Sequence, residues 1–122
     1  MTALAVVLQS IKVKDDNDNW TRGAGDIYIN YNTNDGINHS NGTLGEYSIN
    51  SGQTRALGVT IGTFDDVDTL VALNVDVFDA DYPDADDYMG SVNVSYGPWD
   101  FGEGTHTVAS EDYDLTFSIV PV

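Results

Sequence analysis

The sequence contains eight short apolar runs separated by turn-forming residues, and this spacing limits the fold more than any other feature. In most runs apolar and polar residues alternate, as at Leu115, Phe117 and Ile119. Alternation with a period of two is typical of strands that bury one face. No segment shows helical periodicity over three turns. The sequence therefore predicts an all-β protein, an eight-stranded antiparallel β-sandwich.

The expected strands follow one another along the whole chain. They comprise residues 3–14, 26–32, 44–50, 55–63 and 69–78, an alternating run after Gly90, a short run over 105–110 and a last run from Leu115 onward. Residues 33–43 are expected to form a polar surface loop and residues 65–68 an acidic turn. Trp99, beside Pro98, is expected to close one end of the core. The length of 122 residues, without linker or repeat, predicts a single domain over 1–122.

The charge of the chain excludes several classes of partner. Four Lys and Arg against twenty Asp and Glu give a net charge of −16, and no basic stripe is present that could bind nucleic acid. The absence of Cys excludes disulfides and thiolate metal sites, and two distant histidines make a poor zinc site. His39 is expected at the surface. We expect no nucleic-acid partner and, since no catalytic motif is present, no enzymatic activity.

An acidic loop interrupts the alternation between residues 78 and 90. It holds five carboxylates within a few residues of one another: Asp79, Asp81, Asp84, Asp86 and Asp87. Like charges at ~4 Å repel by ~4 kcal/mol at an effective dielectric constant of ~20. Solvent can screen this repulsion, but a set of oxygen ligands also suits Ca²⁺. We favour the cation, because a second loop rich in oxygen ligands precedes a strand at residues 15–26.

The order of the strands predicts which loops share an end of the sandwich. If consecutive strands run antiparallel, alternate loops fall at the same end. Loops 15–26, 50–54 and 79–88 and the bend near Glu111 then lie together. Loops 33–43, 64–68 and 97–104 lie at the other end. The two acidic loops therefore converge, and Asp65, Asp66 and Asp68 stay apart from them.

The acidic loop resembles the third calcium loop of C2 domains. That family has Asp-x-Asp, five residues, and Asp-x-x-Gly, and here Asp79, Asp81, Asp87 and Gly90 stand at this spacing. The first loop of the family ends in Asp-Pro-Tyr, and Asp26-Ile27-Tyr28 keeps the Asp and the Tyr. A first calcium loop between the first two strands resembles the permuted, type II strand order of the family.

The resemblance implies a calcium-binding module with its ligands in the two loops. The metal ligands implied are Asp79, Asp81, Asp87 and Asp26, with one or two of Asp15, Asp16 and Asp18. Asp84 and Asp86 are either auxiliary ligands or solvated, and we favour solvated. Trp20, Tyr82 and Pro83 are candidate contacts at the loop tips. The family implies calcium-dependent binding of phospholipid or protein, although this chain lacks a polybasic strand.

Two other functions fit the same loops. One is a structural or adhesion module that Ca²⁺ only rigidifies. The other is a calcium-dependent carbohydrate-binding module, in which Tyr82, Trp20 or Tyr88 supplies a stacking face for a glycan. The apolar run at residues 3–8 is too short for a signal peptide or a membrane span, so a cytoplasmic or peripheral membrane location is expected by default.

Overall fold

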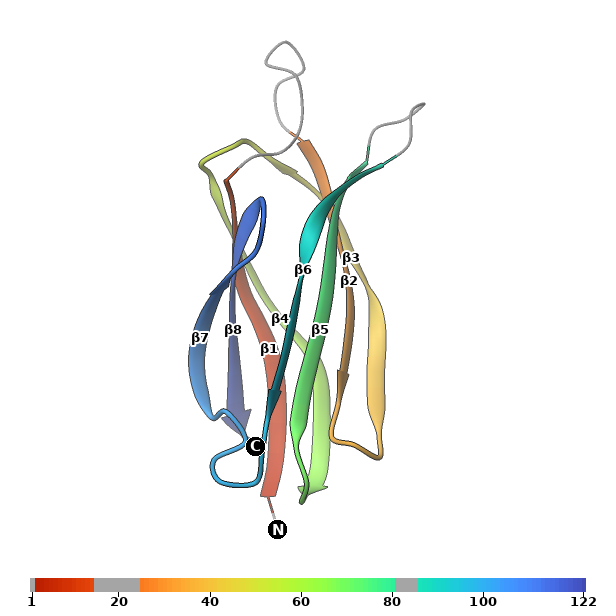
Figure 1. Ribbon diagram of the computed structural model, residues 1–122, viewed down its shortest axis with the longest axis vertical. Coiled ribbons are helices and arrows are strands. Elements are labelled where there is room, and N and C mark those ends of the chain that lie inside the picture. The colour runs from red at the N-terminus through yellow and green to blue at the C-terminus, as the bar shows by residue number, and fades with distance from the viewer. Residues whose placement is uncertain (1, 15–24, 81–85) are drawn as a thin grey trace.

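The computed structural model describes residues 2–14, 25–80 and 86–122, which form two packed β-sheets (Figure 1). The strands are β1 (Thr2–Val13), β2 (Gly25–Asn34), β3 (His39–Ile49), β4 (Thr54–Val67), β5 (Val71–Ala80), β6 (Asp87–Tyr96), β7 (Gly104–Ala109) and β8 (Tyr113–Pro121). One sheet has the order β4-β1-β8-β7 and the other the order β3-β2-β5-β6. All neighbouring strands are antiparallel. The predicted eight-stranded antiparallel sandwich is confirmed.

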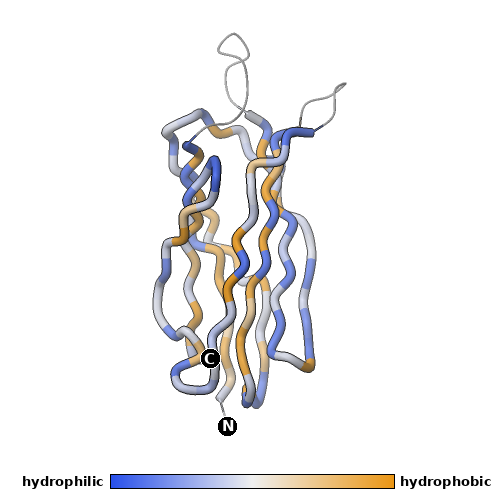
Figure 2. The backbone as a smooth tube through the Cα atoms, viewed as in Figure 1, coloured by the Kyte–Doolittle hydropathy of each residue, from blue (hydrophilic) through white to orange (hydrophobic). Residues whose placement is uncertain are grey.

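The core lies between the two sheets and follows the alternation in the sequence (Figure 2). On β5, Val71, Leu73, Val75 and Val77 face inward and are at most 1% exposed, while the residues between them face outward. Such alternation places every second side chain on the buried face. No helix in the described residues is long and apolar enough to cross a membrane.

Residues 33–43 do not form the expected surface loop. They are mostly strand, because β2 and β3 form a hairpin in which Asn34 pairs with His39. The carboxylate Oδ1 of Asp35 accepts hydrogen bonds from the backbone N–H groups of Ile37 (2.9 Å) and Asn38 (2.7 Å) and so closes a tight turn. Polar residues do not prevent strand formation here, since Asn32, Asn41 and Thr43 are exposed and the hydroxyl of buried Thr33 donates to the Ala72 carbonyl (2.8 Å). His39 is exposed, as expected.

Two further expectations, for the acidic segment 65–68 and for Trp99, are wrong. The acidic segment 65–68 is mostly part of β4 rather than a turn, since Phe64 and Val67 continue to bury their side chains. Trp99 does not close the core, because its side chain is 99% exposed. Phe101, which is 8% exposed, belongs to the core instead.

The prediction of which loops share an end is confirmed. The strand ends that flank the connections β1–β2, β3–β4, β5–β6 and β7–β8 lie at one end of the sandwich, here named the loop end, and β1 begins and β8 ends near the other end (Figure 1). At the loop end, the backbone N–H of Gly52 donates to the carbonyl of Val13 (2.6 Å), and the backbone N–H of Lys14 donates to the carbonyl of Asp112 (2.8 Å). The turn between β4 and β5, which contains Asp68, lies at the opposite end.

Candidate metal-binding end

Asp79 occupies the last inward-facing position of β5 at the loop end. Its side chain is fully buried, which is uncommon for a carboxylate. Ile27 of β2 and Asp87 of β6 are its register partners on the two neighbouring strands. The Oδ1 atom of Asp79 accepts a hydrogen bond of 3.1 Å from the backbone N–H of Asp26. This bond links the start of β2, which follows the first acidic loop, to the end of β5, where the second acidic loop begins.

Asp87 lies directly opposite Asp79 and is half-buried. Side chains at directly paired positions point to the same face of a sheet, and paired like charges destabilise it. The two carboxylates therefore form an acidic pair on the inner face, where the β5–β6 connection begins and ends. An oxygen-only pair of this kind suits a hard cation such as Ca²⁺.

Asp26 and Asp86 stand at the edge of this pair rather than inside it. Asp26 is exposed and alternates with buried Gly25 and Ile27, so it is its backbone that contacts Asp79. Asp86 is also exposed and accepts a hydrogen bond of 2.6 Å from the hydroxyl of Tyr28.

The hydrogen bond to Asp86 is the main cause that raises the pKa of Tyr28 to about 12. Burial and the negative charges of Asp86 and Glu46 raise it further. A neutral phenol that donates to a carboxylate resists ionisation, since the phenolate would face that charge without the bond.

The turn between β7 and β8 packs against β6 at Met89 and Gly90, which follow Asp87 on the same strand. The hydroxyl of Tyr113 donates to the carbonyl of Gly90 (3.0 Å), and the backbone N–H of Asp112 donates to the carbonyl of Met89 (3.2 Å). Burial raises the pKa of the Tyr113 hydroxyl. Sequence reasoning missed Tyr113; its place two residues before Leu115 in the alternation is the signal that could have found it.

Three of the four basic residues also lie at the loop end, which the sequence alone did not indicate. Lys12 and Arg55 stand where β1 and β4 pair, and Lys14 follows the end of β1. The Nζ atom of Lys14 lies 3.5 Å from an Asp114 carboxylate oxygen and donates to the Ser110 carbonyl (2.7 Å). The guanidinium of Arg55 lies 5.0 Å from the ring centre of Tyr47. Most of the positively charged residues of the chain therefore lie at the loop end.

The remaining predicted site residues lie outside the described residues. They are Asp15, Asp16, Asp18 and Trp20 of the first loop, and Asp81, Tyr82, Pro83 and Asp84 of the second. Among residues 2–14, 25–80 and 86–122, no three Asp, Glu or His side chains are grouped closely enough to hold a metal ion. The described part thus brings Asp79 and Asp87 together, with Asp26 and Asp86 at their edge.

Comparison with known proteins identifies the fold as that of a C2 domain. No family model and no curated protein sequence matches the chain. Among solved structures, one described as a C2 domain covers 99% of this chain and 98% of its own, with 16% identity and a TM-score of 0.58. The first C2 domain of plant extended synaptotagmin 1 covers 98% and 93%, with 12% identity and a TM-score of 0.55. The resemblance to C2 domains is therefore confirmed at the level of fold.

A third similar structure is part of a much larger protein. Human GIVD cytosolic phospholipase A2, determined with an inhibitor and terbium chloride, matches with a TM-score of 0.60 and 11% identity. The match covers 98% of this chain but only 17% of the phospholipase chain. It concerns one domain-sized portion of that enzyme.

Proposed function

We propose that the loop end binds Ca²⁺ and that this C2-like module uses the bound ion to attach to phospholipid. The observation that carries the proposal is the fully buried Asp79 directly opposite Asp87, at the base of two acidic loops. The adjacent like charges of a buried and a half-buried carboxylate repel each other, and a bound cation would offset that repulsion. The acidic loops supply further oxygen ligands in their sequence.

The ligand types fit a hard cation. Carboxylate oxygens of Asp79 and Asp87 would hold the ion on the inner face, and Asp26, Asp81 and one or two of Asp15, Asp16 and Asp18 are proposed to complete its coordination. Ca²⁺ takes six to eight oxygen ligands in flexible geometry, whereas Mg²⁺ requires a stricter octahedron. Bound calcium would supply positive charge that offsets the repulsion between the loops. The loop carboxylates then draw together and leave the loop end less negative.

Phospholipid is the proposed target because of the fold and of the charges at the loop end. The similar structures include portions of a phospholipase A2 and of an extended synaptotagmin. Lys12, Lys14 and Arg55 flank the acidic loops and would meet the phosphate of a head group. The proposal does not include an enzymatic activity.

Thermal unfolding in EDTA, in Mg²⁺ and in Ca²⁺ tests the metal site. A ligand that binds only the native state adds ~2.7 kcal/mol at 100 times its Kd, which raises the melting temperature of a domain of this size by several degrees. We expect this rise in Ca²⁺ and a much smaller one in Mg²⁺. Identical curves in Ca²⁺ and EDTA would contradict the proposed metal site.

A pair of matched substitutions tests the location of the site. Asp79→Asn and Asp81→Asn each remove a proposed ligand charge and should weaken Ca²⁺ binding at least about tenfold. Asp66→Asn removes the same charge at the opposite end, and Asn tolerates the positive φ of 54° found at Asp66. Calorimetric titration with Ca²⁺ should find Asp66→Asn unchanged. Equal weakening in all three variants would rule out a site at the loop end.

Sedimentation with liposomes separates the alternatives once calcium binding is found. Cosedimentation with anionic phospholipid that needs Ca²⁺ supports the proposed attachment. If Ca²⁺ raises the melting temperature but no liposome binds, the structural or adhesion function is favoured. Calcium-dependent binding on a glycan array would favour the carbohydrate-binding alternative instead.

A further inference from the structure

The outward face of the sheet β3-β2-β5-β6 has a line of asparagines across all four strands. Asn41 pairs with Asn32, Asn32 with Asn74, and Asn74 with Asn93. Directly paired residues lie side by side, so these four amides, here named the asparagine row, cross the sheet at steps of ~4.8 Å. All four side chains are exposed.

Most of the amides in this row have hydrogen-bonding capacity to spare. Within the described residues, the side chains of Asn32, Asn41 and Asn74 form no hydrogen bond with the protein. On the outward face of the other sheet, by contrast, hydroxyls bond to one another, as Thr107 does to Thr116 (2.8 Å). Each free amide offers two donors and an acceptor. The row can therefore bond to a ligand that both donates and accepts.

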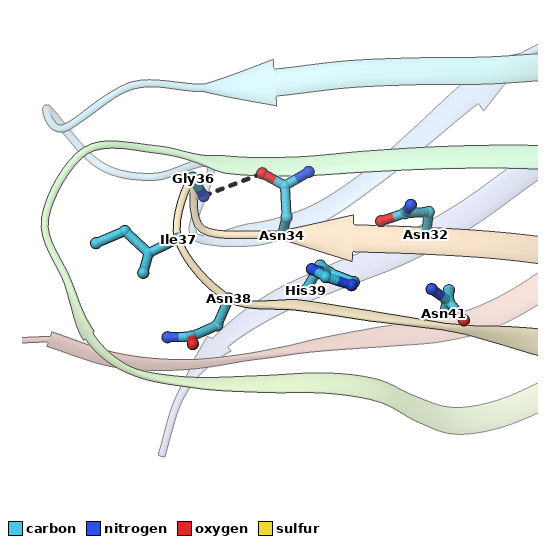
Figure 3. A pocket seen from close by; sticks show the side chains of 7 residues that line it. All are labelled: Asn32, Asn34, Gly36, Ile37, Asn38, His39 and Asn41. Carbon is cyan, nitrogen blue, oxygen red and sulfur yellow. Dashed lines mark hydrogen bonds between the residues drawn. The ribbon is translucent and has the colours of Figure 1, made fainter.

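A cleft of about 330 Å³ lies at one end of the row, over the β2–β3 hairpin (Figure 3). Its lining is mostly amide: Asn32, Asn34, Asn38 and Asn41 with His39 and Ile37. The turn beneath it is fixed by Asp35 and by the hydrogen bond from the backbone N–H of Gly36 to Asn34 Oδ1 (3.0 Å). A preformed polar hollow of this kind binds a ligand at a low cost in ordering.

An aromatic row lies on the same face, nearer the loop end. The rings of Tyr28 and Phe78 stack at 5.2 Å and 15°, and those of Phe78 and Tyr88 meet at 5.5 Å and 50°. Tyr88 is 51% exposed. Along β5, Phe78 is four residues from Asn74, a distance of ~14 Å. Rings and amides thus share one surface that is long enough for several units of a chain-like ligand.

The asparagine row and the cleft hold no carboxylate, whereas Asp26, Asp76 and Asp86 lie at the aromatic end of the face. Between the cleft and the aromatic row the outward positions are Asn30, Thr43 and Ser91, with Asp76 as the carboxylate among them. The hydroxyl of Tyr88 donates to Asp76 at 3.3 Å. The uncharged amides of the asparagine row and the cleft suit an uncharged ligand better than a cation or an anion.

We propose that this face binds a neutral polysaccharide. Sugar hydroxyls both donate and accept hydrogen bonds, which matches the amides of the asparagine row, and the C–H face of a sugar ring packs on Tyr28 and Tyr88. The amides of the row and the cleft include none of the proposed metal ligands, so binding there does not need Ca²⁺. It is separate from the calcium-dependent attachment at the loop end.

Native electrophoresis in gels that contain a polysaccharide tests this proposal. The panel is xyloglucan, galactomannan, mixed-linkage glucan and starch, all neutral, with alginate and heparin as charged controls, and every gel contains EDTA. At least one neutral polysaccharide should retard the protein. Retardation by none of the four, or by the charged polymers alone, would overturn the proposal.

Substitutions locate the binding surface. The double variant Asn32→Ala/Asn74→Ala removes two amides that have no hydrogen-bond partner among the described residues. Its melting temperature should stay unchanged while its affinity for the retarding polysaccharide falls about tenfold. Thr107→Ala/Thr116→Ala on the other sheet is the matched control and should bind as the unmodified chain does. Equal retardation of both double variants would overturn the proposal. Retardation that needs Ca²⁺ would also overturn it, and would assign the sugar to the loop end.

Discussion

Single residues at the loop end have roles set by the strand on which they stand. Asp79 and Asp86 belong to the same acidic segment of the sequence, yet one is fully buried opposite Asp87 and the other is exposed. The difference arises because Asp79 is still at an inward-facing position of β5. Asp86 precedes β6 and bonds to Tyr28 on the outward face. The charge of Asp79 therefore acts inside the sandwich on Asp87, whereas the charge of Asp86 acts at the surface on Tyr28.

The hydrogen bond from Tyr28 to Asp86 predicts that Tyr28 ionises at a higher pH than an ordinary tyrosine does. The pKa of Tyr28 is about 12 in the folded protein, against an ordinary value of ~10 in the unfolded chain. A raised folded-state pKa means that the contribution to stability is complete below pH ~10 and is lost as the pH rises through ~12.

The phenolate absorbance of the unmodified chain, minus that of Tyr28→Phe, should titrate with a midpoint about two units above an ordinary tyrosine. Asp86→Asn should lower this midpoint. A midpoint near pH 10 in the unmodified chain would contradict the hydrogen bond.

At the scale of elements, the loop end is held together by β6 and the β7–β8 turn. A bulge near Met89 shifts the register of β6, so that Val77 pairs with Gly90 and Phe78 with Tyr88. Gly90 has a φ of +113°, and a Cβ atom there would lie 2.5 Å from Ser110 Oγ and 3.2 Å from the Glu111 backbone nitrogen. The close approach of two elements from opposite sheets therefore requires a glycine at this position.

Gly90→Ala should destabilise the protein more than Gly104→Ala. Both glycines have nearly the same φ, +113° and +118°. Backbone strain should therefore lower the free energy of unfolding of each variant by ~1–3 kcal/mol. At Gly104 no atom lies within 4 Å of the added Cβ, whereas at Gly90 the turn must also move. The free energy of unfolding in urea measures the difference. Equal losses would show that the turn adapts without cost.

At the scale of the whole molecule, the net negative charge destabilises the folded state. The net charge of −16 is spread over a small sandwich whose described residues have one ion pair, Lys14 with Asp114. Self-repulsion of this kind destabilises a compact state, and salt screens it. The core between the two sheets supplies the apolar burial that outweighs it.

The melting temperature in EDTA should therefore rise with the concentration of KCl. The Debye length falls from ~10 Å at 0.1 M to ~3 Å at 1 M, so most repulsion between surface carboxylates is removed over this range. Calorimetry at neutral pH and again at acidic pH, where the carboxylates are protonated, measures the effect. The rise should be large at neutral pH and small in acid. A similar rise in melting temperature at both pH values would show that salt acts by strengthening apolar burial and not by screening the carboxylates.

What the sequence by itself determined is the set of local patterns. Alternation predicted the eight strands, and their antiparallel order predicted that the two acidic loops share an end. These inferences succeed because the inward or outward direction of a side chain depends only on its own strand. The motif of Asp79, Asp87 and Gly90 likewise lies within one segment, which is why its resemblance to C2 domains could be recognised.

Only the tertiary structure decided which side chains from distant strands are neighbours. The asparagine row joins four strands, and its alignment depends on the register of each pair, including the bulge near Met89. The strand conformation of residues 33–43 and the choice of Phe101 over Trp99 for the core also depend on packing. Register and packing result from contacts across the whole sandwich, and no local pattern in the sequence specifies them.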